Sequence, residues 1–244
     1  MSSIIDTAIQ CLRDESQALI DLIPTIGADF QHAVELILQC PGKVIVTGVG
    51  KSGHIGAKIA ATLSSTGTPS FFINPLDAFH GDLGVIGTED LVLAISNSGE
   101  TDELLRFFPY LLARQIPVIG MSGNEKSLLA QYSSVHLNIS VKKEACPMGL
   151  APTTSTTVTL ALGDALACAL IVARDFKASD FAQFHPGGAL GRRLLTCAKD
   201  VMHTDNLPTI APTTLMGEAL MHMTSGRLGL CVAIDQNNIV GIVT

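Results

Sequence analysis

Two serines and a threonine surround a glycine in the segment Ser96-Asn97-Ser98-Gly99-Glu100-Thr101, which joins an apolar run to a predicted helix. Hydroxyl groups and accessible backbone N–H groups in such a loop can hold a phosphate, and a helix N-terminus adds partial positive charge. An ordinary helix cap needs only one Ser or Thr, whereas this segment has three. The segment therefore predicts a phosphate cradle, with a simple N-cap as the alternative.

A second candidate anion site is Gly48-Val49-Gly50-Lys51-Ser52-Gly53. It matches the dinucleotide pattern G-x-G-x-x-G, but that pattern also needs an acid after the second strand, where the sequence has Asn74. A P-loop would need a glycine at Ile45. A lysine at a helix start is unfavourable unless an anion binds there, so Lys51 favours an anion site. A solvated lysine is the alternative.

Four titratable residues are candidates for proton transfer. Glu144 follows two lysines and precedes a Cys-Pro pair, and a carboxylate beside a lysine can act as an acid or base; a surface charge cluster is the alternative. Glu103 lies in the first turn of a predicted helix, where acids also occur simply because they stabilise the dipole. His80 and His185 precede glycine-containing turns, and an imidazole with a pKa near 6.5 suits proton transfer. Capping of backbone groups is the alternative for both histidines.

Short apolar runs alternating with amphipathic segments indicate βαβ units and a doubly wound, parallel, five-stranded α/β sheet. We expect strands at about 43–47, 70–73, 91–95, 117–120 and 135–139, and helices at about 52–65, 101–114, 126–131 and 154–173. Ligands bind beyond the carboxyl ends of parallel strands. Loops 48–53, 74–81, 96–101, 122–125 and 142–150 should therefore meet, and most of the candidate residues lie on them.

The two ends of the chain have different patterns. Residues 1–40 show helical periodicity interrupted at Pro24, which predicts an N-terminal helical segment. The sheet domain is expected at 41–196. Residues 201–244 predict a β-α-β-β unit, whose core is too small to be stable alone. We therefore expect it to be an incomplete second domain.

Composition excludes several classes of protein. The 244 residues carry a net charge of −7, which argues against nucleic acid or an anionic membrane surface as the main partner. The most apolar stretch, residues 158–173, contains Asp164 and is expected to be too short for a membrane span. No signal sequence is evident, and the six cysteines form no C-x-x-C pair. These features predict a cytoplasmic protein.

Hydrophobic residues make up 47% of the chain, which suggests apolar surface buried between subunits.

The motifs as a set resemble the arabinose-5-phosphate isomerase branch of the sugar isomerase (SIS) domain family. Together they extend over about residues 43–195, and the tail from Val201 resembles the first half of a cystathionine-β-synthase-type (CBS) module. Besides the segments at Gly48 and Ser96, the resemblance rests on Ser65-Thr66-Gly67-Thr68-Pro69, His80-Gly81-Asp82, Lys143-Glu144-Ala145-Cys146-Pro147, Ala151-Pro152-Thr153-Thr154-Ser155 and His185-Pro186-Gly187-Gly188.

This resemblance implies interconversion of D-ribulose 5-phosphate and D-arabinose 5-phosphate through an enediol, supplying Kdo for lipopolysaccharide or capsule, and a homotetramer with no cofactor. It implies catalytic roles for Lys51, Glu103, Glu144 and His185, with either glutamate as the base and His185 in ring opening or proton relay. The implied substrate contacts are Ser52, Gly67, Thr68, His80, Ser96, Ser98 and Thr101. Because His185 is remote in sequence from the strand-end loops, a neighbouring subunit could supply it.

Three further expectations follow. Many members of this family have a histidine where this sequence has Asn74, and an asparagine is a poor zinc ligand; we expect weak zinc binding and no required metal. A non-catalytic sugar-phosphate sensor is the main alternative function, and it would need the cradle without the acid and base residues. An NAD-dependent dehydrogenase is a further alternative, which nicotinamide binding would reveal.

Overall fold

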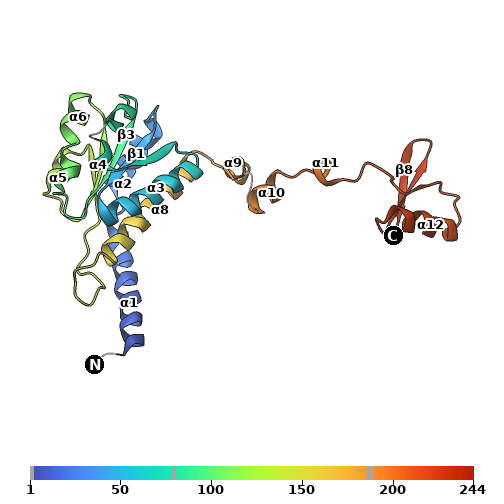
Figure 1. Cartoon of the computed structure of the whole chain (residues 1–244), viewed down its shortest axis with the longest axis horizontal. Coiled ribbons are helices and arrows are strands. Elements are labelled where there is room, and N and C mark those ends of the chain that lie inside the picture. Colours follow the sequence, from blue (N-terminus) through green and yellow to red (C-terminus); the bar gives the residue numbers. More distant parts are fainter. Residues whose placement is uncertain (1–2, 79–80, 186–188) are drawn as a thin grey trace. The chain divides into compact units, whose positions relative to one another are not determined.

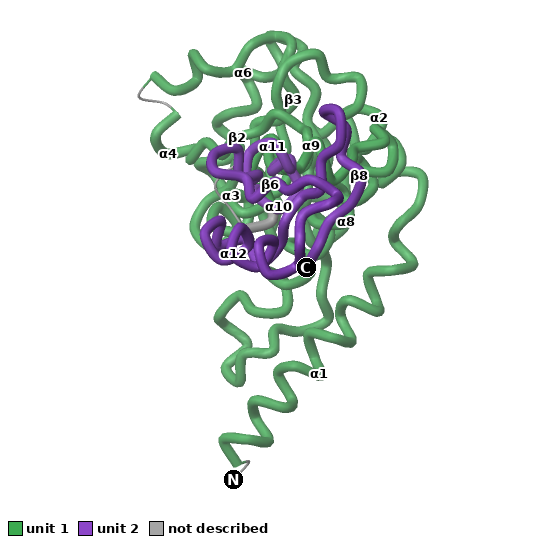
Figure 2. The backbone as a smooth tube through the Cα atoms, turned by 90° about the vertical axis from the view of Figure 1, so that its right-hand side faces the viewer, with its two compact units in different colours: residues 1–191 green, residues 192–244 purple. Residues whose placement is uncertain are grey.

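The computed structural model describes residues 3–78, 81–185 and 189–244 of the chain. Many of its helices and strands are labelled in Figure 1. The chain divides into two compact units, residues 1–191 and residues 192–244, which Figure 2 draws in green and purple. The helical segment predicted at 1–40 belongs to the first unit.

A five-stranded parallel sheet forms the centre of the first unit, in the order β2-β1-β3-β4-β5. This order and the helices on both faces confirm the predicted doubly wound α/β fold. Strands β1 and β3 are buried throughout their lengths, as expected for strands covered on both sides. The strands are β1 (Val44–Gly48), β2 (Ser70–Ile73), β3 (Leu91–Ile95), β4 (Val118–Ser122) and β5 (Val135–Asn138).

Alternate strand residues face two separate hydrophobic cores. Val44 and Val46 of β1 pack with the helices of one face, whereas Ile45 packs with those of the other. The first face is covered by α2 (Ala28–Gln39), α3 (Gly50–Ser65) and α8 (Thr154–Ala173), with α1 (Ile4–Leu22) packed against α8. The second is covered by α4 (Pro75–Ala78), α5 (Asp102–Leu105), α6 (Phe108–Ala113) and α7 (Leu128–Tyr132). Short 3₁₀ turns lie at Ile23–Thr25 and Asp82–Val85.

The prediction of one continuous helix at 101–114 is wrong. The structure has two helices there, α5 and α6, which are separated at Arg106 and Phe107. Pro109 lies in the first turn of α6, where its missing N–H costs nothing. In the interior of one continuous helix the same proline would remove a backbone hydrogen bond.

Helix α8 has the predicted bounds, but the expectation that its apolar stretch is too short for a membrane span is wrong. Its 20 residues make it long and apolar enough to cross a membrane by length and composition alone. However, buried residues recur along its length from Thr154 to Leu170, and Gly163 allows a close approach to Ile59 of α3. Asp164 is paired with Lys58 of α3. These contacts are those of a core helix.

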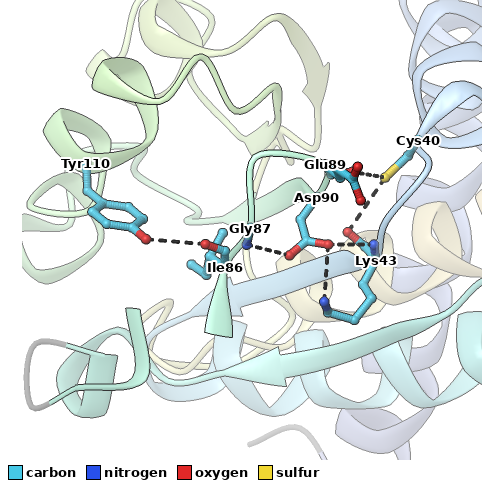
Figure 3. A network of polar contacts seen from close by, with 7 residues as sticks. All are labelled: Cys40, Lys43, Ile86, Gly87, Glu89, Asp90 and Tyr110. Atoms are coloured by element: carbon cyan, nitrogen blue, oxygen red, sulfur yellow. Dashed lines mark hydrogen bonds and ion pairs between the residues drawn. The ribbon is translucent and has the colours of Figure 1, made fainter. Parts of the chain in front are cut away.

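A buried carboxylate, Asp90, fixes the amino ends of β1 and β3 (Figure 3). Its Oδ1 atom accepts a hydrogen bond of 2.7 Å from the Lys43 backbone and lies 3.3 Å from Lys43 Nζ, and its Oδ2 atom accepts one of 2.8 Å from the Gly87 backbone. The Cys40 thiol donates to the Glu89 carbonyl across 3.3 Å. These contacts hold the two central strands in register, so that their carboxyl ends meet at one edge of the sheet.

The second unit has the predicted β-α-β-β order. Strand β6 (Thr209–Ile210) pairs parallel with β7 (Cys231–Asp235), which pairs antiparallel with β8 (Asn238–Val243), and α12 (Met216–Gly226) lies between β6 and β7 in sequence. Ala219 and Cys231 are buried, whereas large apolar side chains of α12 and β8 are exposed. Three shorter helices precede β6: α9 (Ala178–Phe184) belongs to the first unit, α10 (Ala189–Leu195) crosses the boundary between the units, and α11 (Ala198–Val201) belongs to the second.

Candidate functional site

Three hydroxyl groups cluster where β3 ends. Ser96 Oγ lies 2.8 Å from Thr101 Oγ1 and 3.4 Å from Ser98 Oγ, and it also accepts a hydrogen bond of 3.0 Å from the Gly99 backbone. Ser96 is 3% exposed, Thr101 is half-buried and Ser98 is exposed. The cluster therefore has a fixed, buried base and an accessible rim. This arrangement can hold an anion with hydroxyl and backbone donors.

The loop after β4 supports this cradle from behind. Gly99 has a φ of +70°, and a Cβ added there would lie 2.1 Å from Ser127 Oγ, so only glycine fits. Glu100 turns away and accepts a hydrogen bond of 2.9 Å from the Leu128 backbone at the start of α7. Gly123 donates to the Asn97 carbonyl across 2.9 Å. These contacts hold the backbone of the cradle in place.

A cavity of about 320 Å³ opens over the cradle. Lys51 and Ser52 from the first turn of α3 line it, so the structure brings these two predicted residues together with Ser96, Ser98 and Thr101. The N-termini of α3 and α8 both contribute to the wall, and helix N-termini carry partial positive charge. With the Lys51 ammonium they make the cavity suitable for a phosphate ester. The full lining is Val49, Lys51, Ser52, Ile55, Ser96, Asn97, Ser98, Thr101, Pro152, Ser155, Thr156 and Thr159.

The glycines of the Gly48–Gly53 motif have a packing role. A Cβ at Gly53 would lie 2.6 Å from the Gly48 carbonyl oxygen, and one at Gly48 would lie 2.9 Å from the Ile95 carbonyl oxygen. The motif therefore lets the start of α3 approach β1 and β3 closely. This approach delivers Lys51 and Ser52 to the cavity.

Glu144 caps the start of α8. Its Oε2 atom accepts hydrogen bonds from the Thr153 backbone (2.8 Å), the Thr153 hydroxyl (3.1 Å) and the Ser155 backbone (3.2 Å). Burial opposes the charge, but the hydrogen bonds from Ser155 and Thr153 outweigh it and hold the pKa of the Glu144 carboxyl below its usual value. Glu144 does not itself line the cradle cavity, but Ser155, which it holds, does.

Glu103 is half-buried on α5, two residues after Thr101, and lies outside the cavity lining. His80 lies outside the described residues. Asn74 accepts a hydrogen bond of 3.1 Å from the Leu76 backbone and directly precedes α4.

Gly67, Thr68 and His185 are at the other edge of the sheet. Gly67 and Thr68 precede β2, and Arg174, just after α8, donates to the Gly67 carbonyl (3.0 Å) and to the Thr68 hydroxyl. Phe176 packs over Gly67 and stacks on Phe184. His185 follows directly; its ring stacks on Phe181 with centroids 4.1 Å apart, and its Nδ1 lies 3.2 Å from the Phe181 carbonyl oxygen.

The predicted residues thus form separate groups within one chain. The 20-residue helix α8 extends about 30 Å, with its first turn in the cavity wall and its end beside Gly67. Sequence reasoning missed Asn97, Pro152, Thr156, Thr159 and the bridging Arg174. Pro152 and Ser155 belong to the motif Ala151–Ser155, and the position of this motif before an apolar helix is the available signal that part of it lines a site.

Both parts of the chain, the sheet domain and the C-terminal unit, match known protein families. Residues 37–169 match the SIS domain, and residues 198–244 match the CBS domain. The arabinose 5-phosphate isomerase KdsD of Yersinia pestis is 53% identical over 237 residues, which cover 96% of this chain and 72% of that protein. The KdsD of Pseudomonas aeruginosa is 53% identical over 232 residues, covering 94% of this chain and 71% of that protein.

A solved structure from E. coli CFT073, a complex with arabinose 5-phosphate, is also similar. It has 41% sequence identity and a TM-score of 0.73, and the match covers 75% of this chain and 97% of that chain.

Proposed function

The chain belongs to the SIS-domain family of arabinose 5-phosphate isomerases, and from this membership we infer that it interconverts D-ribulose 5-phosphate and D-arabinose 5-phosphate. The main structural observation in support of this inference is the cavity lined by Lys51 and by the hydroxyl groups of Ser96, Ser98 and Thr101. The phosphate of the sugar binds there, and its binding energy positions the reacting carbons.

The reaction moves a proton between two adjacent carbons. In the ketose-to-aldose direction a base removes a proton from C1, and the electrons form an enediolate. A proton is then delivered to C2, and the C2 oxygen gains a proton and becomes a hydroxyl while the C1 hydroxyl loses its proton and becomes the aldehyde oxygen. The enediolate carries negative charge, which Lys51 and the two helix N-termini stabilise. The phosphate ester on C5 takes no part in this proton transfer, so the cradle can hold the same group throughout.

We assign the base to Glu103 and a holding role to Glu144. Three hydrogen bonds on one oxygen and a lowered pKa make the Glu144 carboxylate a weak proton acceptor. At the N-terminus of α8, the Glu144 carboxylate is suited to remain ionised and to hold the first turn of the helix, which forms part of the cavity wall. In D₂O, a Glu103→Gln variant should therefore lose incorporation of solvent deuterium into the sugar, whereas Glu144→Gln should retain part of it.

We further infer that two chains complete each site. In one chain the cavity and the group of Gly67, Thr68 and His185 lie at opposite ends of α8. A second chain that places its His185 group over the cavity would supply the ring-opening acid. Exposed apolar side chains on α1, such as Ile5 and Leu12, are available for such an assembly, which we propose to be a homotetramer.

We place the enzyme in the cytoplasm, with its product supplying Kdo for lipopolysaccharide or capsule. All six cysteines are free thiols, in agreement with a reducing compartment. We propose that no cofactor takes part, because an enediol mechanism needs only acids, bases and charge stabilisation.

The decisive experiment incubates the purified chain with D-ribulose 5-phosphate in the presence of EDTA and follows D-arabinose 5-phosphate. We expect turnover that EDTA does not abolish. Binding of the sugar phosphate without turnover would replace the isomerase with a sugar-phosphate sensor. Turnover that is lost in EDTA and restored by a metal would contradict the metal-free mechanism.

A further inference from the structure

Helix α1 carries two copies of one polar arrangement on the same face. Asp14 and Asp21 are seven residues apart, which is about two helical turns. One carboxylate oxygen of each accepts a hydrogen bond of 2.9 Å from the glutamine one turn earlier, Gln10 or Gln17. The other oxygen of each is left for a partner outside the helix.

Those partners are two consecutive lysines after β5. Lys143 Nζ lies 2.7 Å from Asp14 Oδ2, and Lys142 Nζ lies 2.7 Å from Asp21 Oδ2. The Asp14 side chain is only 15% exposed. Figure 1 shows the segment between β5 and α8 running beside α1. We call these four residues the α1 clamp.

The clamp ends one residue before Glu144. The Glu144 carboxylate holds the backbone of Thr153 and Ser155 at the start of α8, and Ser155 lines the cradle cavity. Two sets of polar contacts, joined by the peptide bond between Lys143 and Glu144, therefore connect α1 with the cavity wall. Nothing else in the reaction scheme gives a role to Asp14 or Asp21.

We propose that Asp14 and Asp21 are positioning residues, which act through Lys143 and Lys142 to hold Glu144 and the first turn of α8 in place at the cavity wall. The effect on turnover rests on the proposed isomerase function, whereas the effect on the α8 N-terminus does not. The clamp acts on the first turn of α8 and does not contact the Ser96, Ser98 and Thr101 hydroxyls, so kcat should fall by a larger factor than KM rises.

The primary test compares the full chain with its Asp14→Asn/Asp21→Asn variant. Hydrogen–deuterium exchange at the Thr153 and Ser155 amides should become at least about threefold faster, because exposed ion pairs contribute modestly and two are lost. We expect kcat to fall roughly three- to tenfold with KM within about twofold. Unchanged exchange at both amides would overturn the proposal.

Two further variants separate positioning from a general weakening of α1. Asp21→Lys combined with Lys142→Asp restores a pair of opposite charges with reversed direction, and it should recover most of the exchange protection lost in Asp21→Asn. Asp6→Asn changes the capping box at the start of the same helix and should leave both amides protected. Loss of protection in Asp6→Asn equal to that in the double variant would show a merely structural role and overturn the proposal.

The wild-type chain provides a test that needs no substitution. At about 1 M NaCl the screening length falls to about 3 Å, so the exposed clamp pairs weaken and exchange at Thr153 and Ser155 should accelerate. The absence of this acceleration would count against the clamp, even if the variants failed to fold. If exchange responds as expected but no isomerisation occurs, the proposed function fails and the clamp remains.

Discussion

The Glu144 carboxylate accepts a hydrogen bond of 2.8 Å from the Thr153 backbone at the N-terminus of α8. Together with the Ser155 contact it holds the pKa of Glu144 below its ordinary value. The ionised form therefore favours the folded state. This contribution is fully present above the unfolded-state pKa of about 4.3 and is lost as the pH falls through the lower folded-state pKa.

A Glu144→Gln variant should therefore be less stable than the wild type at pH 7, and the difference should shrink in acid. Chemical unfolding at pH 7 and at about pH 3 measures both free energies. The matched variant Glu35→Gln changes an exposed glutamate of α2 that accepts from Gln31, and it should cost little at either pH. A Glu144→Gln deficit that stayed constant down to pH 3 would contradict the link to ionisation.

Substitutions of the cradle hydroxyls should affect substrate binding and protein stability to different extents. Ser98 is exposed at the rim, so Ser98→Ala should raise KM about tenfold with little change in kcat or melting temperature. Ser96 is buried, and its hydroxyl bonds the Thr101 hydroxyl and accepts from the Gly99 backbone, so Ser96→Ala should also cost about 0.5–1.5 kcal/mol of stability for each hydrogen bond lost. Steady-state kinetics and thermal unfolding distinguish the two. A kcat loss in Ser98→Ala without a KM change would argue against phosphate binding there.

The sequence predicted the strands and the meeting of the 48–53 and 96–101 loops, because buried parallel strands have apolar runs and their carboxyl ends share one edge. It did not predict the break between α5 and α6, which depends on one proline, Pro109. It also did not predict that Phe176 packs over Gly67 and stacks on Phe184, the residue before His185. That proximity depends on Arg174 and Phe176 after α8, and such contacts between distant segments have no local pattern.

Lys51 should contribute mainly through its charge. Lys51→Met should weaken binding of inorganic phosphate and lower kcat/KM by roughly 10²-fold, with a smaller dependence of the remaining activity on salt, because exposed charges are screened. Lys126→Met is a suitable control, since Lys126 is exposed and lies outside the cavity lining. Isothermal calorimetry with phosphate and kinetics at two salt concentrations provide the measurements. Equal phosphate affinity in the wild type and Lys51→Met would show that the Lys51 charge does not contribute to phosphate binding.

Gly67 should be sensitive to any side chain for a reason that does not involve substrate. Its φ is +91°, and a Cβ would lie 2.8 Å from two ring carbons of Phe176. Gly67→Ala should therefore lower the free energy of unfolding by more than about 1 kcal/mol. Adding Phe176→Leu should recover only the part that comes from the steric clash, because the backbone strain remains. Unfolding titrations of both variants test this, and a neutral Gly67→Ala would contradict the observed packing.

The arrangement of His185 at the far end of α8 predicts complementation between inactive chains. Lys51→Met lacks the cavity lysine, and His185→Ala lacks the imidazole. If each site takes its cavity from one chain and His185 from another, co-expression of the two variants in equal amounts leaves roughly a quarter of the sites with both wild-type groups, by random pairing within a symmetric oligomer. Activity near a quarter of wild type is therefore expected in the co-expressed sample, and almost none in either variant alone.

Mixing the separately purified oligomers without subunit exchange is the control and should remain inactive. Sites contained in single chains would give no recovery in either sample, because no chain would then carry both wild-type groups.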